Sequence, residues 1–485
     1  MDNIITNNSI LDILELSEED CEVTNFEIVG NEKRLTIHKV NKPHFCPICN
    51  SRLHSKGILT RYPNHQILRD GYKLVITAKS RRWTCSNNSC DYTETDIFSF
   101  IEPRKKNTKL TDIQILYEMK DLRKSCSQLA KDYLVSDTYI HNLFMRYVDL
   151  PRKPLPEYMA VDEVHTNISP KAKYALVIMD FKNNCVIDIL KSRRNYITEQ
   201  YFLSIPYDER KKVKYIICDM YKPYIKYVTR FFPNAIVITD SFHVIQWLLN
   251  LINLYINEVK KKYQERDRRN LQNQNIYYGR FQKKPTLSNE VYILNYARWV
   301  LLKNEDNIDY SPPKRFNTKL NQYLDTYDWE LKFLALDNNF EEIRRLKEKY
   351  IFFNKSHIND LIGAAEDLDL LINEYSASSI NIFNEFSKLL IKYKESIINS
   401  FIYITKDSSD SHFNELRRLS NGPIESYNNK PSSYRSQSHG IQNWDFTRNR
   451  LLWAARDDAS LLAIPKSLDE IKNQTGIIRG PYKKK

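Results

Sequence analysis

The chain has 485 residues and a mass of 57.7 kDa, more than the roughly 250–300 residues that one hydrophobic core serves, so we expect at least two domains. Its 42% hydrophobic and 12% aromatic residues supply enough apolar material to fold, which excludes a disordered chain. The 73 Lys and Arg against 60 Asp and Glu give a net charge of +13 and favour a polyanionic partner such as DNA, although a solvated basic surface has the same balance.

The N-terminal sequence carries no export signal. The start, MDNIITNNSILDILELSEED, lacks the basic and apolar regions of a secretory leader, and no apolar run reaches the roughly 18 residues that span a bilayer. We therefore expect a cytoplasmic protein without a membrane partner. In that reducing compartment, closely spaced cysteines bind a metal more often than they form a disulfide.

Residues 1–104 are expected to form a β-rich module. Apolar residues alternate in CEVTNFEIV, RLTIHKV and YKLVITAKSRRWTC, and hairpin-type turns stand at Gly30-Asn31 and Asp70-Gly71. Alternation of this kind, bounded by turn residues, predicts short strands.

Two cysteine pairs flank turns of this module: Cys46 with Cys49, and Cys85 with Cys90. Each pair is short enough for both sulfurs to bind one ion, and together they supply the four tetrahedral ligands of a structural Zn²⁺. The alternative is a set of small buried thiols without metal. Three histidines are close enough in sequence to replace a cysteine: His44, His54 and His65. Core packing is expected for the isolated cysteines: Cys21, Cys126, Cys185 and Cys218.

Residues 105–150 favour a helix-turn-helix. A first helix is expected around Ser127–Tyr133, followed by a turn and by a second helix that starts after Ser136, a good N-cap. The DNA-facing residues of that second helix, with its N-cap, would be these: Ser136, Thr138, Tyr139, Asn142 and Arg146. An ordinary helical hairpin has the same spacing, but a neighbouring zinc module in a basic chain favours DNA binding.

Residues 151–240 predict the first part of an α/β core, after a linker stiffened by three prolines. The apolar segments EYMAVDEV, YALVIMDF and CVIDILKS follow one another closely and predict an antiparallel meander. VKYIICDM and AIVITD are separated by a helix-like stretch and predict parallel strands. This order is RNase H-like.

Residues 241–420 are expected to be a long all-helical insertion, because Pro is scarce and apolar residues recur at helical spacing. The turn at Asn421-Gly422-Pro423 would return the chain to the sheet. Residues 421–485 would then complete the core and end in a basic tail, PYKKK.

Carboxylates at strand ends are candidates for metal-dependent phosphodiester chemistry. That chemistry uses two divalent ions, roughly 3.5–4 Å apart, held by converging acids. Asp162 interrupts an apolar strand and Asp219 ends one, and such acids are costly to bury unless paired or metal-bound.

Three further acids end or interrupt apolar segments: Asp180, Asp188 and Asp240. A meander places Asp180 at the far end of the sheet from Asp162. In an RNase H-like sheet the fourth strand neighbours the first, and the fifth lies one spacing of roughly 4.8 Å further, which favours Asp219 over Asp240. Asp240 and His243 are expected to border the site, or to be structural.

Glu425 is the candidate third acid after the insertion. It stands in the first turn of an expected helix, where a simple capping role explains it equally well. Composition alone does not choose this residue, and Glu415 is the next candidate.

A set of motifs runs in a fixed order over nearly the whole chain: CPIC, RRWTCSNNSC, the helix-turn-helix, VDEV, ICDMYKPY, FPNAIVITDSFHV, NGPIESYNNK, Arg435, HG and FTRNRLLW. In this order they resemble the transposases of the ISL-three group of bacterial insertion sequences. The chain departs from the family pattern at Ser241, Ser426 and Pro431, and keeps the three acids.

The resemblance implies a DDE-type enzyme. Its catalytic acids would be Asp162, Asp219 and Glu425, which would hold two Mg²⁺ or Mn²⁺ ions. The zinc ligands would be Cys46, Cys49, Cys85 and Cys90. The implied partners are double-stranded DNA, at transposon ends and target, and further copies of the chain in a homo-oligomer at the bacterial nucleoid.

Three functions follow from these features. The first is a transposase that binds terminal inverted repeats and catalyses DNA cleavage and strand transfer. The second is a catalytically silent DNA-binding regulator or transposase remnant, which has no need of Asp162 within an apolar strand. The third is an RNase H-like nuclease, which gives no reason for the two N-terminal modules.

Overall fold

The chain folds into a mixed α/β protein with two compact units. The computed structural model describes residues 11–16, 21–40, 43–66, 71–102, 105–169, 172–220, 222–273, 288–406, 415–438 and 443–474. The first unit contains Met1–Pro151, Thr166–Pro170 and Lys430–Lys485, and the second contains Arg152–His165 and Lys171–Asn429. The expected core segment 421–485 is thus divided between the units at Lys430, and the basic tail and Asp70 lie outside the described residues.

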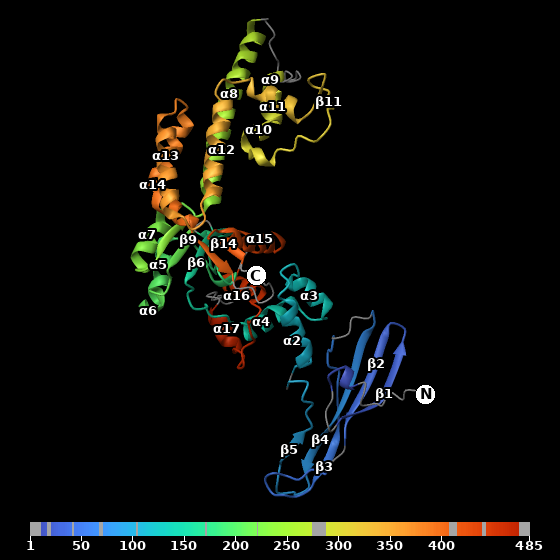
Figure 1. The fold of residues 1–485 in the computed structure, drawn as a ribbon. Helices are drawn as coiled ribbons and strands as arrows, with labels where there is room; N and C mark the ends of the chain where they lie inside the picture. Colours follow the sequence, from blue (N-terminus) through green and yellow to red (C-terminus); the bar gives the residue numbers. More distant parts are fainter. Residues whose placement is uncertain are drawn as a thin grey trace, which may run out of the picture. The chain divides into compact units, whose positions relative to one another are not determined.

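The first unit begins with a twisted sheet in the order β1-β2-β4-β3, with β5 paired to β4 (Figure 1). The strands are β1 (Cys21–Val29), β2 (Glu32–Lys39), β3 (Leu53–Arg61), β4 (Lys73–Cys85) and β5 (Thr93–Thr95). β2 and β4 run parallel, whereas β1 pairs with β2, and β3 with β4, in antiparallel fashion. The parallel pair and strand β3 were not expected from the sequence.

The side chains of β2 and β4 that point to one face form the core of this sheet. Leu35, Ile37, Ile76 and Ala78 are buried together with residues of β1 and of the segment after β5. The tight turn between β1 and β2 uses Gly30 with a φ of +60°, a conformation that favours glycine.

His65 links this module to the helices that follow. Its Nδ1 lies 2.8 Å from the Thr108 hydroxyl and its Nε2 lies 3.0 Å from the Leu14 carbonyl oxygen, with the ring fully buried. Thr108 also caps the next helix, because its side chain accepts the Thr111 N–H. Burial lowers the pKa of His65 from 6.5 to about 4.

The depressed pKa of His65 predicts acid sensitivity of the first unit. The unfolded chain binds a proton on this ring below pH 6.5 and the folded chain only below about 4, so stability falls as the pH drops through that window and no further below it. The loss amounts to about 3 kcal/mol at 1.36 kcal/mol per pKa unit. Urea unfolding at stepped pH with excess Zn²⁺ measures it. His65→Gln should show a shallower pH dependence, and an unchanged slope would contradict the assignment.

The described part of the first unit also contains the helices α2 (Lys109–Glu118), α3 (Cys126–Asp132), α4 (Asp137–Tyr147), α16 (Trp444–Ala455) and α17 (Leu468–Gln474). α16 packs on the other helices through buried polar contacts. The Trp453 indole donates to the Leu116 carbonyl oxygen at 2.8 Å, and the buried Arg450 guanidinium donates to the carbonyl oxygens of Asp121 and Lys124. The C-terminal helices therefore form part of the scaffold around α3 and α4.

The second unit contains a five-stranded sheet in the order β10-β9-β6-β7-β8. Its strands are β6 (Tyr158–Ser169), β7 (Ala172–Asp180), β8 (Cys185–Leu190), β9 (Tyr215–Cys218) and β10 (Ile236–Thr239). β7 and β8 are antiparallel, and β9 is parallel both to β6 and to β10. This is the strand order expected from the sequence. The segments between its strands carry the helices α5 (Asn195–Ser204) and α6 (Tyr207–Arg210), which precede β9, and α7 (Lys222–Phe231), which connects β9 to β10.

A helical region follows β10. Its helices are α8 (Ser241–Asn273), α9 (Asn289–Tyr296), α10 (Trp299–Leu302), η1 (Glu305–Asn307), α11 (Thr326–Leu334), α12 (Phe340–Ser356), α13 (Leu361–Ala377), α14 (Asn381–Ile398) and η2 (Asn399–Phe401). The long α8 and α12 lie side by side, as do α13 and α14 (Figure 1).

The prediction that residues 241–420 are entirely helical is wrong in two places. A hairpin of β11 (Arg315–Asn317) and β12 (Gln322–Leu324) turns at Asn321, which has a φ of 54°. A second hairpin pairs β13 (Tyr403–Lys406) with β14 (Glu415–Arg418). Each strand has only three or four residues, too few for a periodic signal to emerge beside long amphipathic helices.

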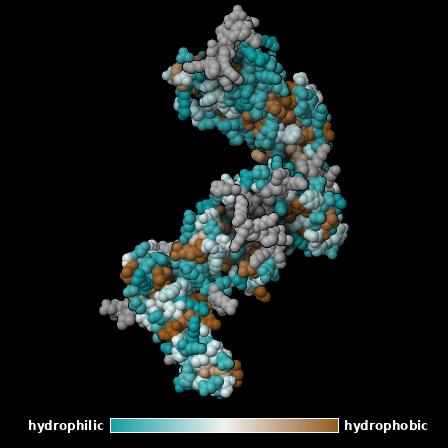
Figure 2. Space-filling view, turned by 180° about the vertical axis from the view of Figure 1, so that it is seen from behind, coloured by the Kyte–Doolittle hydropathy of each residue, from teal (hydrophilic) through white to brown (hydrophobic). Residues whose placement is uncertain are grey.

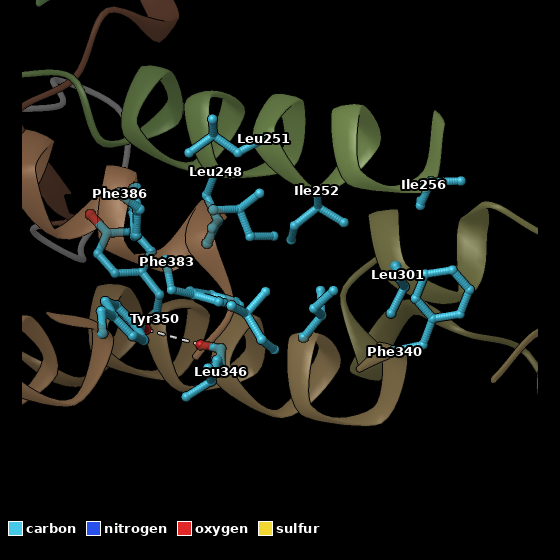
Figure 3. Packing of buried hydrophobic residues seen from close by; sticks show 14 of the residues in the cluster. Leu248, Leu251, Ile252, Ile256, Leu301, Phe340, Leu346, Tyr350, Phe383 and Phe386 are labelled. Carbon is cyan, nitrogen blue, oxygen red and sulfur yellow. Dashed lines mark hydrogen bonds between the residues drawn. The ribbon is translucent and has the colours of Figure 1, made fainter. Parts of the chain in front are cut away.

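Apolar residues of α8 and α12 form the core of the helical region. Leu248, Ile252 and Ile256 extend from α8 toward Phe340 and other residues of the layer below (Figure 3). These α8 positions recur every four residues, which is the spacing of one helix face. The Tyr375 hydroxyl crosses between helices and donates to the Leu346 carbonyl oxygen at 2.9 Å.

The helix α15 (Gly422–Gln437) starts at the predicted turn and continues through Pro431. Exposed hydrophobic side chains are scattered over both units, and Figure 2 shows them in brown among hydrophilic residues. Among the described residues, none of the helices combines the length and the apolar content that a bilayer-crossing segment requires.

Candidate active site and metal centres

Three acidic residues lie at one end of the second unit's sheet. The register pairs Ala160 of β6 with Ile217 of β9, and Thr239 of β10 with Cys218. Asp162 lies two residues after Ala160, and Asp219 lies two residues after Ile217, so the two aspartates stand at equivalent positions of neighbouring strands. The Asp240 N–H donates to the Cys218 carbonyl oxygen at 3.1 Å. Parallel strands thus bring the three carboxylates to a common edge.

Glu425 approaches this edge from the first turn of α15. Its N–H donates to the Asn421 carbonyl oxygen at 2.9 Å, which is the first bond of the helix. Its carboxylate Oε1 lies 3.4 Å from Nε2 of His243, and the same nitrogen lies 3.9 Å from Oδ2 of Asp240. Ligand atoms of Asp240, His243 and Glu425 all lie within 4.8 Å of one another.

Asp162 has a strongly perturbed carboxyl group. Burial raises its pKa to about 6, and the negative charges of Asp219 and Glu425 add to this rise. The Asn428 side chain, three residues after Glu425 on α15, donates to Oδ2 of Asp162 at 2.7 Å. Burial also raises the pKa of Glu425 and of Asp240. Negative charges also raise the pKa of Asp162 and of Glu425, and carboxylates gathered in this way attract a divalent cation.

Hydrogen bonds from the helical region fix the strand ends that carry these acids. The Tyr393 hydroxyl donates to the carbonyl oxygen of Met220, next to Asp219, at 2.8 Å. The hydroxyls of Thr239 and Ser396 lie 2.7 Å apart beside Asp240. Helix α14 therefore holds β9 and β10 at the end where the site lies.

The other acids considered from the sequence have different surroundings. Asp180 accepts the N–H groups of Lys182 and Asn183 in the turn after β7, at the end of β7 that lies beside Tyr158. Asp188 is buried on β8, where its carboxylate accepts the Ile189 N–H. The side chain of Glu415 lies outside the described part of the chain.

The four cysteines of the two closely spaced pairs converge. Sγ of Cys46 lies 3.7 Å from Sγ of Cys90, Sγ of Cys49 lies 3.4 Å from Sγ of Cys85, and all four lie within 4.8 Å of one another. A tetrahedral site with Zn–S bonds of about 2.3 Å has S–S edges of roughly 3.8 Å, so the donor set fits zinc. Hydrogen bonds with Ser51 lower the pKa of Cys49 to about 6, toward the thiolate that binds metal.

None of the three candidate histidines joins the cysteine group. The His44 ring contacts the Trp83 ring in a tilted arrangement with centroids 4.5 Å apart, and its Nδ1 lies 3.2 Å from Oε1 of Glu94. His65 is bonded to Thr108 as described, and His54 is exposed on β3. The candidate zinc site is therefore a four-cysteine site.

In the helix-turn-helix candidate, α4 begins after Ser136, whose hydroxyl accepts the Tyr139 N–H at 3.1 Å. The turn before it places Leu134 at a φ of 54°. Thr138 is exposed, whereas Asn142 and Arg146 are half-buried. The expectation that Tyr139 faces solvent is wrong, because its hydroxyl donates to both oxygens of the buried Asp112 at 2.7 and 2.8 Å.

A family model of transposases matches residues 159–451, which is more than half of the chain. The chain belongs to the ISL-three group of transposases. The match starts within β6, ends within α16 and includes Asp162, Asp219 and Glu425. A search among curated proteins found no match.

Sequence reasoning missed one polar residue at the transposase's candidate site. Asn428 contacts Asp162, and only its position three residues after Glu425 on the same helix face pointed to it. His243 was expected to border the site or to be structural, and its Nε2 lies 3.9 Å from Asp240 and 3.4 Å from Glu425.

Proposed function

We propose that this transposase is a DDE-type enzyme that cleaves the ends of an insertion sequence and joins them to target DNA. Asp162, Asp219 and Glu425 would be its catalytic acids. The observation that carries the proposal is that Asp162 lies within electrostatic range of both other acids although the three stand on separate segments. The strand order of the second unit supports an RNase H-like core, with the region from α8 to α14 as its insertion.

Each residue would have a defined task. Two divalent ions, when bound, supply activation of the attacking oxygen and stabilisation of the leaving oxygen. Asp162 would hold both ions, because the charges of Asp219 and Glu425 both act on its carboxyl group, and Asp219 and Glu425 would each complete one ion's ligand set. Asn428 would orient the Asp162 carboxylate by its hydrogen bond.

DNA recognition would fall to the first unit. The zinc module and α4 would bind the terminal repeats, and the net charge of +13 favours DNA association. A catalytically silent regulator remains the competing function. It predicts sequence-specific binding that ignores Mg²⁺ and leaves every strand intact.

Substitution of Glu425 separates these functions. We expect Glu425→Gln to lower Mg²⁺-dependent cleavage of end-containing DNA by roughly 10²–10³-fold, the range for losing one electrostatic stabiliser. If Glu425 only caps α15, the variant should lose about 0.5–1 kcal/mol of stability and keep its cleavage rate. Glu385→Gln, at an exposed position of α14, serves as the control and should cleave normally.

Substitution of Thr138 tests the DNA-binding helix. It is exposed at the N-terminal end of α4, the end from which a recognition helix contacts bases. We expect Thr138→Ala to weaken binding to the terminal repeat by about 1 kcal/mol or more, with binding to unrelated DNA unchanged. Tyr139→Phe is the contrast, since losing the bonds to Asp112 should lower the melting temperature. Equal losses on both DNAs for Thr138→Ala would argue against base recognition.

A further inference from the structure

A histidine stands between two acids beside the proposed catalytic residues. Asp240 follows β10, His243 lies in the first turn of α8, and Glu425 lies in the first turn of α15. Nε2 of His243 is 3.4 Å from the Glu425 carboxylate and 3.9 Å from the Asp240 carboxylate. Two segments far apart in sequence, residues 240–243 and the start of α15, thus present one nitrogen and two oxygen ligands to the same point.

These distances suit a single metal ion. An ion with bonds of about 2.0–2.2 Å to nitrogen and oxygen has ligand atoms up to roughly 4.2 Å apart, and tetrahedral neighbours roughly 3.4 Å apart. The distances from Nε2 of His243 to the Asp240 and Glu425 carboxylates both lie in this range. Asp240 is nearly fully buried, whereas the side chains of His243 and Glu425 are about one third exposed, which leaves room for water or a substrate oxygen on their side.

The described protein groups around the three residues do not supply the contacts and the positive charge that such an ion would supply. Nε2 of His243 is buried and has no hydrogen-bond partner among the described residues, because its contact with Glu425 lacks hydrogen-bond geometry. Arg418 acts electrostatically on Asp240, but its guanidinium donates to the carbonyl oxygens of Ser400 and Asn354. The described residues therefore do not fully balance the negative charges of Asp240 and Glu425.

Asn421 provides a second, independent observation. Its N–H donates to the Asp240 carboxylate, and its carbonyl oxygen accepts the backbone N–H of Glu425, so Asn421 is adjacent to both acidic residues. Its side chain is fully buried, and both amide atoms have no hydrogen-bond partner among the residues that the structure describes. Leaving a buried amide without partners costs free energy, which points to a ligand with bound water at this position.

We propose that Asp240, His243 and Glu425 form an additional metal site that prefers a transition-metal ion such as Mn²⁺ to Mg²⁺. The imidazole ligand gives this preference, because hard ions such as Mg²⁺ favour an all-oxygen set. The inference rests on the proposed function in one respect, because Glu425 is also one of the proposed catalytic acids. The site would place one ion next to Asp162 and Asp219 before DNA arrives.

Mn²⁺ binding to the full-length protein without DNA tests the site. Mn²⁺ does not compete with Zn²⁺ for the four-cysteine site, because thiolate ligands prefer zinc. Electron spin echo spectroscopy should detect nitrogen coupled to the bound Mn²⁺. His243→Gln should abolish that coupling and weaken Mn²⁺ binding by more than about 10-fold, the lower limit for residues that only orient ligands. His165→Gln, at an exposed histidine of β6, is the matched control and should keep both.

The wild-type spectrum decides the proposal even if His243→Gln folds poorly. Absence of nitrogen coupling in the wild-type protein would overturn the site, as would its persistence in His243→Gln. A double variant, Asp162→Asn with Asp219→Asn, separates this inference from the proposed function. It should keep nitrogen-coupled Mn²⁺ while losing DNA cleavage. Normal cleavage by this double variant would contradict the proposed function and leave the site standing.

Discussion

Asp162→Asn should lower DNA cleavage and strand transfer by roughly 10³-fold or more and leave DNA affinity within about 3-fold of wild type. The substitution keeps the shape of the side chain and can still accept the hydrogen bond from Asn428. It removes the negative charge that interacts with Asp219 and Glu425, and therefore a ligand that both ions would share. Gel-shift and cleavage assays on the same end-containing DNA measure the two effects separately.

Asp180→Asn is the matched control for this experiment. Asp180 also ends a strand of the same sheet, but its carboxylate caps the turn after β7. An amide oxygen can accept the same N–H groups, so the control should bind and cleave DNA as the wild type does. Cleavage by Asp162→Asn at the control rate would remove Asp162 from the catalytic residues.

We expect the four-cysteine site to hold one Zn²⁺ per chain, and Cys46→Ser should abolish this binding and unfold the end of the first module that carries the site. Apparent binding free energies of structural zinc sites, about 10–16 kcal/mol, act as folding free energy. Among the described residues, the small core at this end has three buried members, Cys46, Leu53 and Trp83, with Tyr92 and the other three cysteines of the site packed against them, so little else stabilises it. Metal analysis and hydrogen exchange should show zinc loss together with loss of protection in β3 and β5.

Two separate cores limit this unfolding. The core around Leu35 and Ile76 contains none of the four cysteines of the candidate zinc site. Protection in β2 should therefore outlast zinc removal. Cys21→Ser is the control, because Cys21 is buried in that other core and its loss should leave the zinc content at one per chain. Full zinc occupancy in Cys46→Ser would contradict the site.

The sequence predicted the features that depend on local pattern. The strands of the five-stranded sheet in the second unit, their order, the cysteine pairs and the Ser136 cap are each signalled by apolar runs, short spacing or a capping residue. Strand β3 escaped prediction because most of its residues are exposed and its register shifts between Ser55 and Gly57. Without alternation, a strand gives no periodic signal.

Long-range pairing explains the remaining errors. Tyr139 has the helix position of a DNA-facing residue, but its hydroxyl is bonded to Asp112, 27 residues earlier. Asn428 and Asp162 are 266 residues apart and meet only because α15 returns to the sheet. The choice of Glu425 rested on family resemblance, since a helix-capping glutamate has the same local sequence. Only tertiary structure distinguishes such pairs.

Asp162, Asp219 and Glu425 are proposed to bind the catalytic ions, and anomalous scattering from Mn²⁺ in crystals of the DNA complex would locate these ions. We expect two manganese peaks roughly 3.5–4 Å apart, with Asp162 contacting both and with Asp219 and Glu425 each contacting one. A further peak at His243 is compatible with this result. Manganese bound near the DNA with no contact to Asp162 or Asp219 would show that these acids do not hold the catalytic ions.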